Sequence, residues 1–245
     1  MTRNFRLSCL CLALGLLLCS TQTVAWVEVG GNIVNDTTWS ATDTIHVGSS
    51  VTVQIGATLT IEPGTVMLFD PYMRLLTLGR LQALGDSDAP IIFSSAADTS
   101  GGSPVASGWS GLEIRGATDC LLRHCAVRYA LDAIYVRSTE VALESCTIEN
   151  FYSRGVYVYT DSAADNLVTR LDRCTVRQST AGSSGTGTAI FVYKFGAVEA
   201  QHSRLQDCEY GLNVYGFQSY QPRFDIDNCQ IEGHKVDGVH IYTGG

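Results

Sequence analysis

The sequence predicts an all-β fold in which short parallel strands wind into a solenoid, with one coil per repeat. A five-residue pattern, with a small residue first and apolar residues at alternate positions, recurs six times. Successive copies begin 22, 22, 34, 22 and 27 residues apart, so the unit is about 22 residues long. Gly, Asn, Ser and Asp interrupt the runs, and no helical period appears after the first 25 residues. The six copies span residues 111–115, 133–137, 155–159, 189–193, 211–215 and 238–242.

Insertions account for the two longer steps. The 34- and 27-residue steps hold one coil plus additional residues, and these must leave the solenoid as loops because the coils stack in register. We expect the loops at residues 160–167, 178–188 and 216–221. The second of these is rich in Gly and Ser, a composition typical of flexible segments.

A second pattern lies between the copies of the first and places a column of cysteines on the inside of the coils. Its copies span residues 122–127, 143–148, 171–176, 200–205 and 226–231, and the column reads Cys125, Cys146, Cys174, Ser203 and Cys229. Equivalent positions of adjacent coils lie about 4.8 Å apart. A Cys125–Cys146 disulfide fits that spacing, but parallel Cβ directions strain it, so we favour stacked thiols and leave both states open. A straight column cannot surround a tetrahedral ion, and we expect no metal and no cofactor.

The first 25 residues have the pattern of a secretory signal peptide. Arginines at positions 3 and 6 precede an apolar run at 7–19, and Thr23-Val-Ala25 forms a cleavage site before Trp26. The run is too short for a transmembrane helix, so we expect an exported protein with no membrane span. Its location would be extracellular, at the cell surface or periplasmic. We divide the chain into a signal peptide at 1–25, an N-terminal cap region at 26–43 and the solenoid at 44–245.

Composition and charge exclude several classes of protein. Charged residues make up 16% of the chain, too few for a coiled coil or a charge-driven disordered segment. Without the predicted signal peptide the chain has 14 basic and 24 acidic residues, a net charge of −10. A nucleic-acid-binding protein carries a basic patch, so we expect no nucleic-acid partner.

Four motifs in the N-terminal half resemble those of a known group of proteins. They are Thr-Thr-Trp at 37–39, Leu-Thr-Ile-Glu-Pro-Gly-Thr at 59–65, Gly-Arg-Leu-Gln-Ala-Leu-Gly at 79–85, and Pro-Ile-Ile-Phe-Ser-Ser at 90–95 ahead of Trp109. With the repeat, they resemble the exported right-handed parallel β-helix proteins of the pectin-lyase-like group, in particular bacterial members mostly of unknown function. The resemblance covers residues 30–245 and implies a right-handed parallel β-helix with a short N-terminal cap. The group includes lyases, hydrolases, epimerases and adhesins, so it implies no single activity.

We expect no C-terminal cap within this sequence, because no capping helix or polar turn follows the sixth copy of the pattern. The ends of solenoids expose strand edges and core, and caps normally cover them. We expect either that further coils follow in a longer protein or that the open end self-associates end to end with another chain.

The outward positions of the first pattern form two columns, and seven of their twelve residues are aromatic. One column reads Glu113, Tyr135, Tyr157, Phe191, Asn213 and His240, and the other reads Arg115, Arg137, Tyr159, Tyr193, Tyr215 and Tyr242. Soluble proteins rarely expose so large an apolar patch without a reason. A tyrosine combines an apolar ring with a polar edge, which suits a sugar ring, and arginines bind carboxylates or sulfates.

These columns predict a polysaccharide partner. The residues expected to bind it are Tyr135, Tyr157, Tyr159, Phe191, Tyr193, Tyr215, Tyr242, Arg115 and Arg137. Two alternatives stay open. Like rings stack well on adjacent strands, so the ladder could exist for stability alone, or a partner chain could cover it.

No catalytic constellation is visible, and we predict no catalytic residues. A glycosidase needs two carboxyl groups facing each other, but only Glu113 lies on the outward face, with Asp161 and Asp165 in a nearby loop. A lyase needs a base and often Ca²⁺, and no acidic cluster on this face would hold the ion. A polysaccharide lyase or glycoside hydrolase working near Glu113, Arg115, Arg137 and residues 160–167 is the first alternative. A structural or adhesive surface protein is the second.

Overall fold

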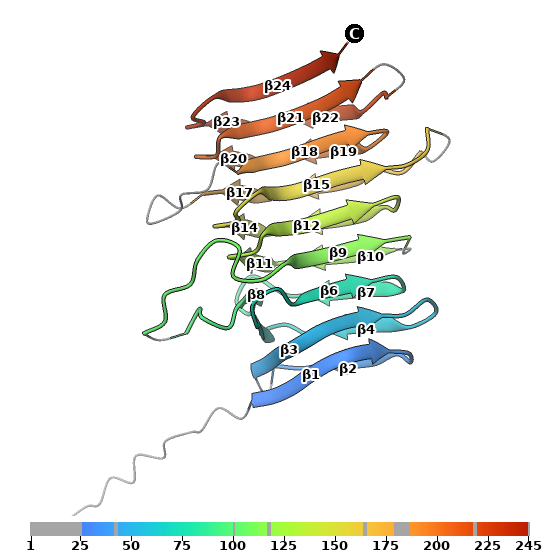
Figure 1. The fold of residues 1–245 in the computed structure, drawn as a ribbon, viewed down its shortest axis with the longest axis vertical. Helices are drawn as coiled ribbons and strands as arrows, with labels where there is room; N and C mark the ends of the chain where they lie inside the picture. Colours follow the sequence, from blue (N-terminus) through green and yellow to red (C-terminus); the bar gives the residue numbers. More distant parts are fainter. Residues whose placement is uncertain are drawn as a thin grey trace, which may run out of the picture.

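The computed structural model describes residues 26–41, 44–99, 101–116, 119–163, 166–178, 187–217 and 220–244. Within these ranges there are 24 β-strands and no helix, and every strand pairing is parallel. The coils stack along one axis from β1 to β24 (Figure 1). The predicted signal peptide lies outside the described residues, as do the central parts of all three predicted loops.

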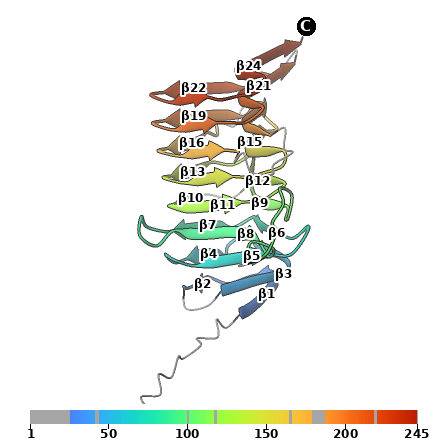
Figure 2. The same ribbon diagram turned by 90° about the vertical axis from the view of Figure 1, so that its left-hand side faces the viewer.

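Each coil contributes strands to three faces, seen from two sides in Figures 1 and 2. Face A carries the five-residue pattern and contains β1 (Trp26–Ile33), β3 (Thr44–Val53), β6 (Arg74–Thr77), β9 (Gly111–Arg115), β12 (Asp132–Arg137), β15 (Arg154–Thr160), β18 (Thr188–Lys194), β21 (Tyr210–Phe217) and β24 (Asp237–Gly244). Face B contains β2 (Thr37–Trp39), β4 (Thr58–Ile61), β7 (Arg80–Leu84), β10 (Cys120–Arg123), β13 (Val141–Glu144), β16 (Thr169–Asp172), β19 (Ala197–Gln201) and β22 (Arg223–Asp227). Face C contains β5 (Val66–Phe69), β8 (Ile91–Ser95), β11 (Cys125–Arg128), β14 (Thr147–Glu149), β17 (Thr175–Arg177), β20 (Arg204–Gln206) and β23 (Gln230–Glu232).

The long strand β3 joins two of these faces. Its residues 44–47 pair with β5 of face C, and its residues 51–53 pair with β6 of face A. Faces A and C are therefore one continuous 16-stranded sheet, and face B is a separate 8-stranded sheet.

Apolar side chains from the three faces fill the interior. Successive side chains of a strand point to opposite sides, so Ile134 and Val136 of β12 face inward and are buried. The equivalent positions of β9, β15, β18 and β21 are buried too, which agrees with the predicted alternation. Val239 and Ile241 of β24 are about half exposed, because no described strand pairs with the outer edge of β24.

The sequence patterns do not reveal the longest excursion from the coils. Residues 96–99 and 101–110 leave the stack between β8 and β9 and project to the left in Figure 1. Trp109 anchors the point where this segment returns. Its ring is fully buried and stacks on Phe69 with 4.1 Å between ring centroids, and its Nε1 donates to the Arg128 carbonyl at 2.7 Å.

One left-handed residue turns the chain from face B to face C in the five coils from β10 onward. These residues have φ between 45° and 53°, a conformation that costs a non-glycine residue about 1 kcal/mol or more. The sharp corner places the next residue, which belongs to the cysteine column, inside the coil. The five corner residues are His124, Ser145, Arg173, His202 and Asn228.

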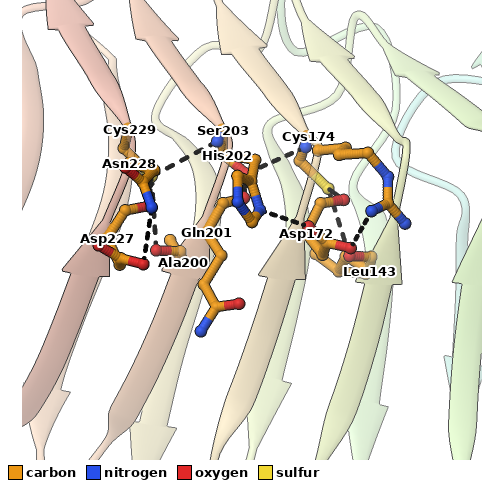
Figure 3. A network of polar contacts seen from close by, with 11 residues as sticks. Leu143, Asp172, Cys174, Ala200, Gln201, His202, Ser203, Asp227, Asn228 and Cys229 are labelled. Carbon is orange, nitrogen blue, oxygen red and sulfur yellow. Dashed lines mark hydrogen bonds and ion pairs between the residues drawn. The ribbon is translucent and has the colours of Figure 1, made fainter.

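The thiols of the column tie adjacent coils together. The Sγ of Cys174 donates to the Leu143 carbonyl at 3.3 Å, and the Sγ of Cys229 donates to the Ala200 carbonyl at 3.4 Å (Figure 3). Ser203 replaces cysteine in the coil between them, and its hydroxyl accepts the backbone N–H of Cys174 at 3.0 Å. All six cysteines of the described residues are free thiols, the state that the sequence favours.

We predict that residues 26–245, purified without reductant, contain six free thiols. In the native protein they react slowly, because burial raises the pKa of the Cys208 thiol to about 12. Cys229, which is only partly buried, reacts first. Ellman's reagent in native buffer and then in guanidinium measures both quantities. A count of four or fewer thiols in denaturant would show that the column forms disulfides.

An imidazole joins the first coils on the outer side of the sheet. Nδ1 of His46, in β3, lies 2.5 Å from Oε2 of Glu28, in β1, and Nε2 lies 2.9 Å from Oδ1 of Asp70, which follows β5. Both ring nitrogens donate only when the imidazole is protonated. The hydrogen bond to Glu28 raises the pKa of His46 above its ordinary value, burial opposes this, and Asp70 adds to the increase.

The His46 bridge predicts a pH dependence of stability. A raised folded-state pKa means that the stabilisation is fully present below the ordinary pKa of 6.5 and is lost as the pH rises through the folded-state pKa. As the pH rises above 6.5, the free energy of unfolding by urea should fall more steeply in the parent protein than in a His46→Gln variant. The variant retains every other titrating group, so parallel curves for the two proteins would contradict the bridge.

Candidate functional site

Seven aromatic rings stand in register on the outward side of face A. The first aromatic column consists of Tyr135, Tyr157 and Phe191, on β12, β15 and β18. The second aromatic column consists of Tyr159, Tyr193, Tyr215 and Tyr242, on β15, β18, β21 and β24. Parallel pairing without register shift keeps each ring above the equivalent ring of the coil below. The structure therefore brings together all seven aromatic residues that the sequence singles out.

Both faces of the Tyr157 ring are covered. Tyr135 stacks on it with 4.6 Å between centroids and 9° between ring planes. The Arg154 guanidinium lies 3.9 Å from the same centroid, and Phe191 leans over it at 5.4 Å. Burial raises the pKa of the Tyr157 phenol to about 12. A sugar ring has no free face of Tyr157 on which to stack.

Arg154 is itself held in place by a two-point ion pair. Its Nε lies 2.8 Å from Oδ1 of Asp132 and its Nη2 lies 2.9 Å from Oδ2. Asp132 and Arg154 are register partners in β12 and β15, and 22 residues separate them. In the first aromatic column, Tyr135 therefore covers one face of Tyr157 by stacking. The Arg154 guanidinium, which Asp132 holds in place, covers the other face through a cation–π contact.

The second aromatic column is more open. Tyr193 meets Tyr159 at 5.7 Å with 39° between ring planes, and Tyr215 at 5.6 Å with 55°. Tilted neighbours cover less of one another's faces than stacked ones do. At the outer end, Tyr215 and Tyr242 stack at 4.7 Å and 11°. Tyr220, in the segment after β21, packs edge-on against Tyr193 at 5.9 Å and widens the apolar surface.

A polar cluster lies at the end of the second column. The Tyr159 hydroxyl donates to Oδ1 of Asp161 at 2.6 Å and accepts from Nζ of Lys194 at 2.6 Å. Nη2 of Arg137 contacts Oδ2 of the same carboxylate at 3.1 Å. The hydrogen bond from Tyr159 and the contact with Arg137 lower the pKa of Asp161. Arg137, predicted to bind a ligand carboxylate, already binds one from the protein.

Arg115 is also occupied by a protein carboxylate. It contacts Glu113, and Nη1 of Arg74 lies 2.9 Å from the other oxygen of that carboxyl group. Glu113 is only 6% exposed, although its register position is outward, because the two arginines cover it. Neither of its oxygens is free to reach a glycosidic bond. Asp165, the other loop acid considered for catalysis, lies outside the described residues.

Four residues of this surface escape the repeat analysis: Arg154, Lys194, Phe195 and Tyr220. Phe195 packs edge-on against Tyr220 at 5.7 Å. The 22-residue step from Asp132 would have identified Arg154 as its partner. Tyr220 has no such signal, because it belongs to an insertion and its position depends on how that loop folds back.

Two kinds of feature are absent from the described residues. They contain no group of three or more His, Cys, Asp or Glu side chains arranged to hold a metal ion. They also contain no helix with the length and apolar character needed to cross a membrane.

The three-faced stack of parallel strands defines a parallel β-helix repeat protein. Residues 91–245 match the family model described as "Right handed beta helix region", and the chain belongs to this family. The match confirms the predicted fold class and agrees with a pectin-lyase-like fold. Comparison with curated proteins gives no match, and neither does comparison with solved structures.

We predict that Arg154 stabilises face A more than an exposed arginine does. Arg154→Leu leaves the partly buried Asp132 without its partner and should lower the free energy of unfolding by about 1–3 kcal/mol. Arg170 of face B, whose ion pair with Glu199 is exposed, is the matched control. Arg170→Leu should cost about 1 kcal/mol or less. Urea unfolding measures both losses, and equal losses would contradict the structural role of the Arg154 pair.

Proposed function

We propose that this protein is an exported, non-catalytic module that binds a polysaccharide on the second aromatic column of face A. The observation that carries the proposal is the run of Tyr159, Tyr193, Tyr215 and Tyr242, whose centroids follow one another at 4.7–5.7 Å. Export rests on the predicted signal peptide at 1–25.

The chemistry of tyrosine supports a glycan as the partner. The C–H face of a pyranose stacks on an aromatic ring, and phenolic hydroxyls bond to sugar hydroxyls at its rim. The rings are fixed by the sheet, so little rotamer entropy is lost on binding. Their regular spacing along the stack suits a polymer better than a single small molecule.

The two aromatic columns differ in what they have available for binding. Tyr135 and Tyr157 have each other and Arg154 as partners, which explains them as stabilising contacts. Tyr193 and Tyr215 meet at 55° and keep ring surface that no such cation covers. Arg137 and Lys194 lie over the Tyr159 ring, at 5.3 and 4.8 Å from its centroid. We therefore centre binding on Tyr193 and Tyr215 of the second column and assign structural support to the first.

The arrangement of the charged groups supports a non-catalytic role. Each arginine that the sequence offers for lyase chemistry is bound to a protein carboxylate: Arg115 to Glu113, and Arg137 to Asp161. Glu113 lies beneath its arginines, and each of its two carboxylate oxygens contacts one of them. Acid–base catalysis needs a group within reach of the substrate, and these groups are already engaged.

The test is affinity electrophoresis of residues 26–245 through gels containing pectin, alginate, xylan or a soluble cellulose derivative. A Tyr193→Ala/Tyr215→Ala variant should lose at least tenfold in affinity for the polysaccharide that retards the parent protein. Its circular dichroism should remain unchanged. Tyr129→Ala is the matched control, because this tyrosine is half-buried at the corner after β11 and belongs to neither column. Unchanged retardation of the double variant would overturn the assignment.

A second candidate function is polysaccharide lyase or glycosidase activity at the end of the same column. The observation that favours it is the cluster in which Tyr159 bridges Lys194 and Asp161 beside Arg137. A phenol between a cation and a carboxylate is a suitable proton-transfer group. Release of reducing ends or of unsaturated product that disappears in Arg137→Ala would establish this function in place of the first.

A further inference from the structure

A hollow of the described surface lies away from both aromatic columns. It has a volume of about 440 Å³ and lies at the corner where the chain passes from face C to face A, beside the start of β6, β9 and β12. Small-molecule sites in proteins range from about 300 to 1,000 Å³. None of the described residues that line it carries a charge. Its walls include Tyr72, Val105, Ser107, Trp109, Ser110 and Leu131.

Tyr72 is held in a costly conformation at the rim. Its side chain is 83% exposed, and its φ is 68°, in the left-handed region that a bulky residue rarely adopts. The turn is fixed by the Met73 N–H, which donates to the Asp70 carbonyl at 3.1 Å, and by the Ser110 hydroxyl, which donates to the Tyr72 carbonyl at 2.8 Å. A rigid turn that points an aromatic ring into solvent contributes nothing to the core.

The opposite wall has the same character. Ser107 also has a positive φ, 70°, and its backbone N–H donates to the Ala130 carbonyl at 3.3 Å. Val105 and Leu131 are 63% and 40% exposed, although both are aliphatic. Left-handed residues also form regular corners of the coils, so the exposed apolar side chains are what distinguish this corner. Strain and exposed apolar surface thus coincide at one uncharged hollow.

We propose that this hollow, which we call the Tyr72 pocket, is a second carbohydrate subsite that takes one uncharged sugar ring. The C–H face of the sugar lies against the Tyr72 ring, and its hydroxyls bond to the Ser107 hydroxyl at the rim. The absence of charged groups in the lining selects a neutral sugar over a uronate or a sulfated one. The inference rests on the proposed function, since the sugar belongs to the same polymer.

A path along the surface leads from this pocket to face A. The Leu131 carbonyl accepts the Ser153 N–H at 2.8 Å, so the two residues are neighbours on successive coils. Ser153, Arg154 and Phe191 line a smaller hollow of about 260 Å³. Phe191 belongs to the first aromatic column and lies 6.2 Å from Tyr193 of the second, measured between centroids. On this path a chain seated in the Tyr72 pocket passes the Asp132–Arg154 ion pair before it reaches the second column.

The test uses xylohexaose and cellohexaose as soluble neutral probes, with isothermal titration calorimetry and the polysaccharide gels described above. Tyr72→Asn removes the ring, and asparagine tolerates the left-handed region better than tyrosine does. The variant should therefore bind about tenfold more weakly while its unfolding temperature stays the same or rises. Tyr72→Phe retains the ring and should bind nearly as the parent does. Ile55→Ala, at a residue that is 84% exposed on another corner, is the control and should change nothing.

The outcomes separate this inference from the proposed function. Normal binding by Tyr72→Asn together with lost binding by Tyr193→Ala/Tyr215→Ala would overturn the subsite and leave the function in place. The reverse pattern would support the Tyr72 pocket and overturn the second column as the site. Stronger binding of polyuronate than of either neutral probe, weakened by Tyr72→Asn, would refute the choice of a neutral sugar. Failure of the parent protein to bind any of these glycans would overturn both proposals.

Discussion

The whole structure depends on parallel pairing in which each residue hydrogen-bonds beside its equivalent one coil away. With strands about 4.8 Å apart, whatever side chain occupies a position is repeated as a column along the stack. A column of inward aliphatic residues forms part of the core, and a column of inward thiols packs the corner between faces B and C. A column of outward tyrosines forms a continuous aromatic surface. The same geometry sets the charged groups, because Asp132 meets Arg154 only through the register that aligns β12 with β15.

Charge pairing divides face A into parts with different roles. Glu113 and Asp161 each hold two cations, and Asp132 holds one. The pair with Asp132 anchors the Arg154 guanidinium, which covers Tyr157. The pairs with Glu113 and Asp161 engage Arg115 and Arg137. The tilted rings of Tyr193 and Tyr215 therefore remain available to a partner. Both columns of face A are rich in aromatic residues. The Tyr157 ring of the first column is covered on both faces, whereas Tyr193 and Tyr215 of the second column keep exposed ring surface.

The repeat predicted the fold well, because alternation and a 22-residue step depend only on local pattern and in-register stacking. The inward positions of β12 and the seven outward rings follow from these rules. The features that depend on irregular segments were not predictable. The excursion at residues 96–110 carries no repeat signal, and neither does Tyr220. The covering of Tyr157 by Arg154 depends on side-chain direction, which a pattern of residue types does not specify.

The left-handed corner between faces B and C has a further implication, for how such a protein can diversify. From β10 onward that corner is made by one residue, followed directly by an inward thiol or hydroxyl, so it has no room for additional chain. The described or predicted insertions of these coils lie at the other two corners, which flank face A. Exchange of loops at those two corners, by evolution or by grafting, would therefore change the borders of face A. The tight corner between faces B and C would meanwhile preserve the register of the coils.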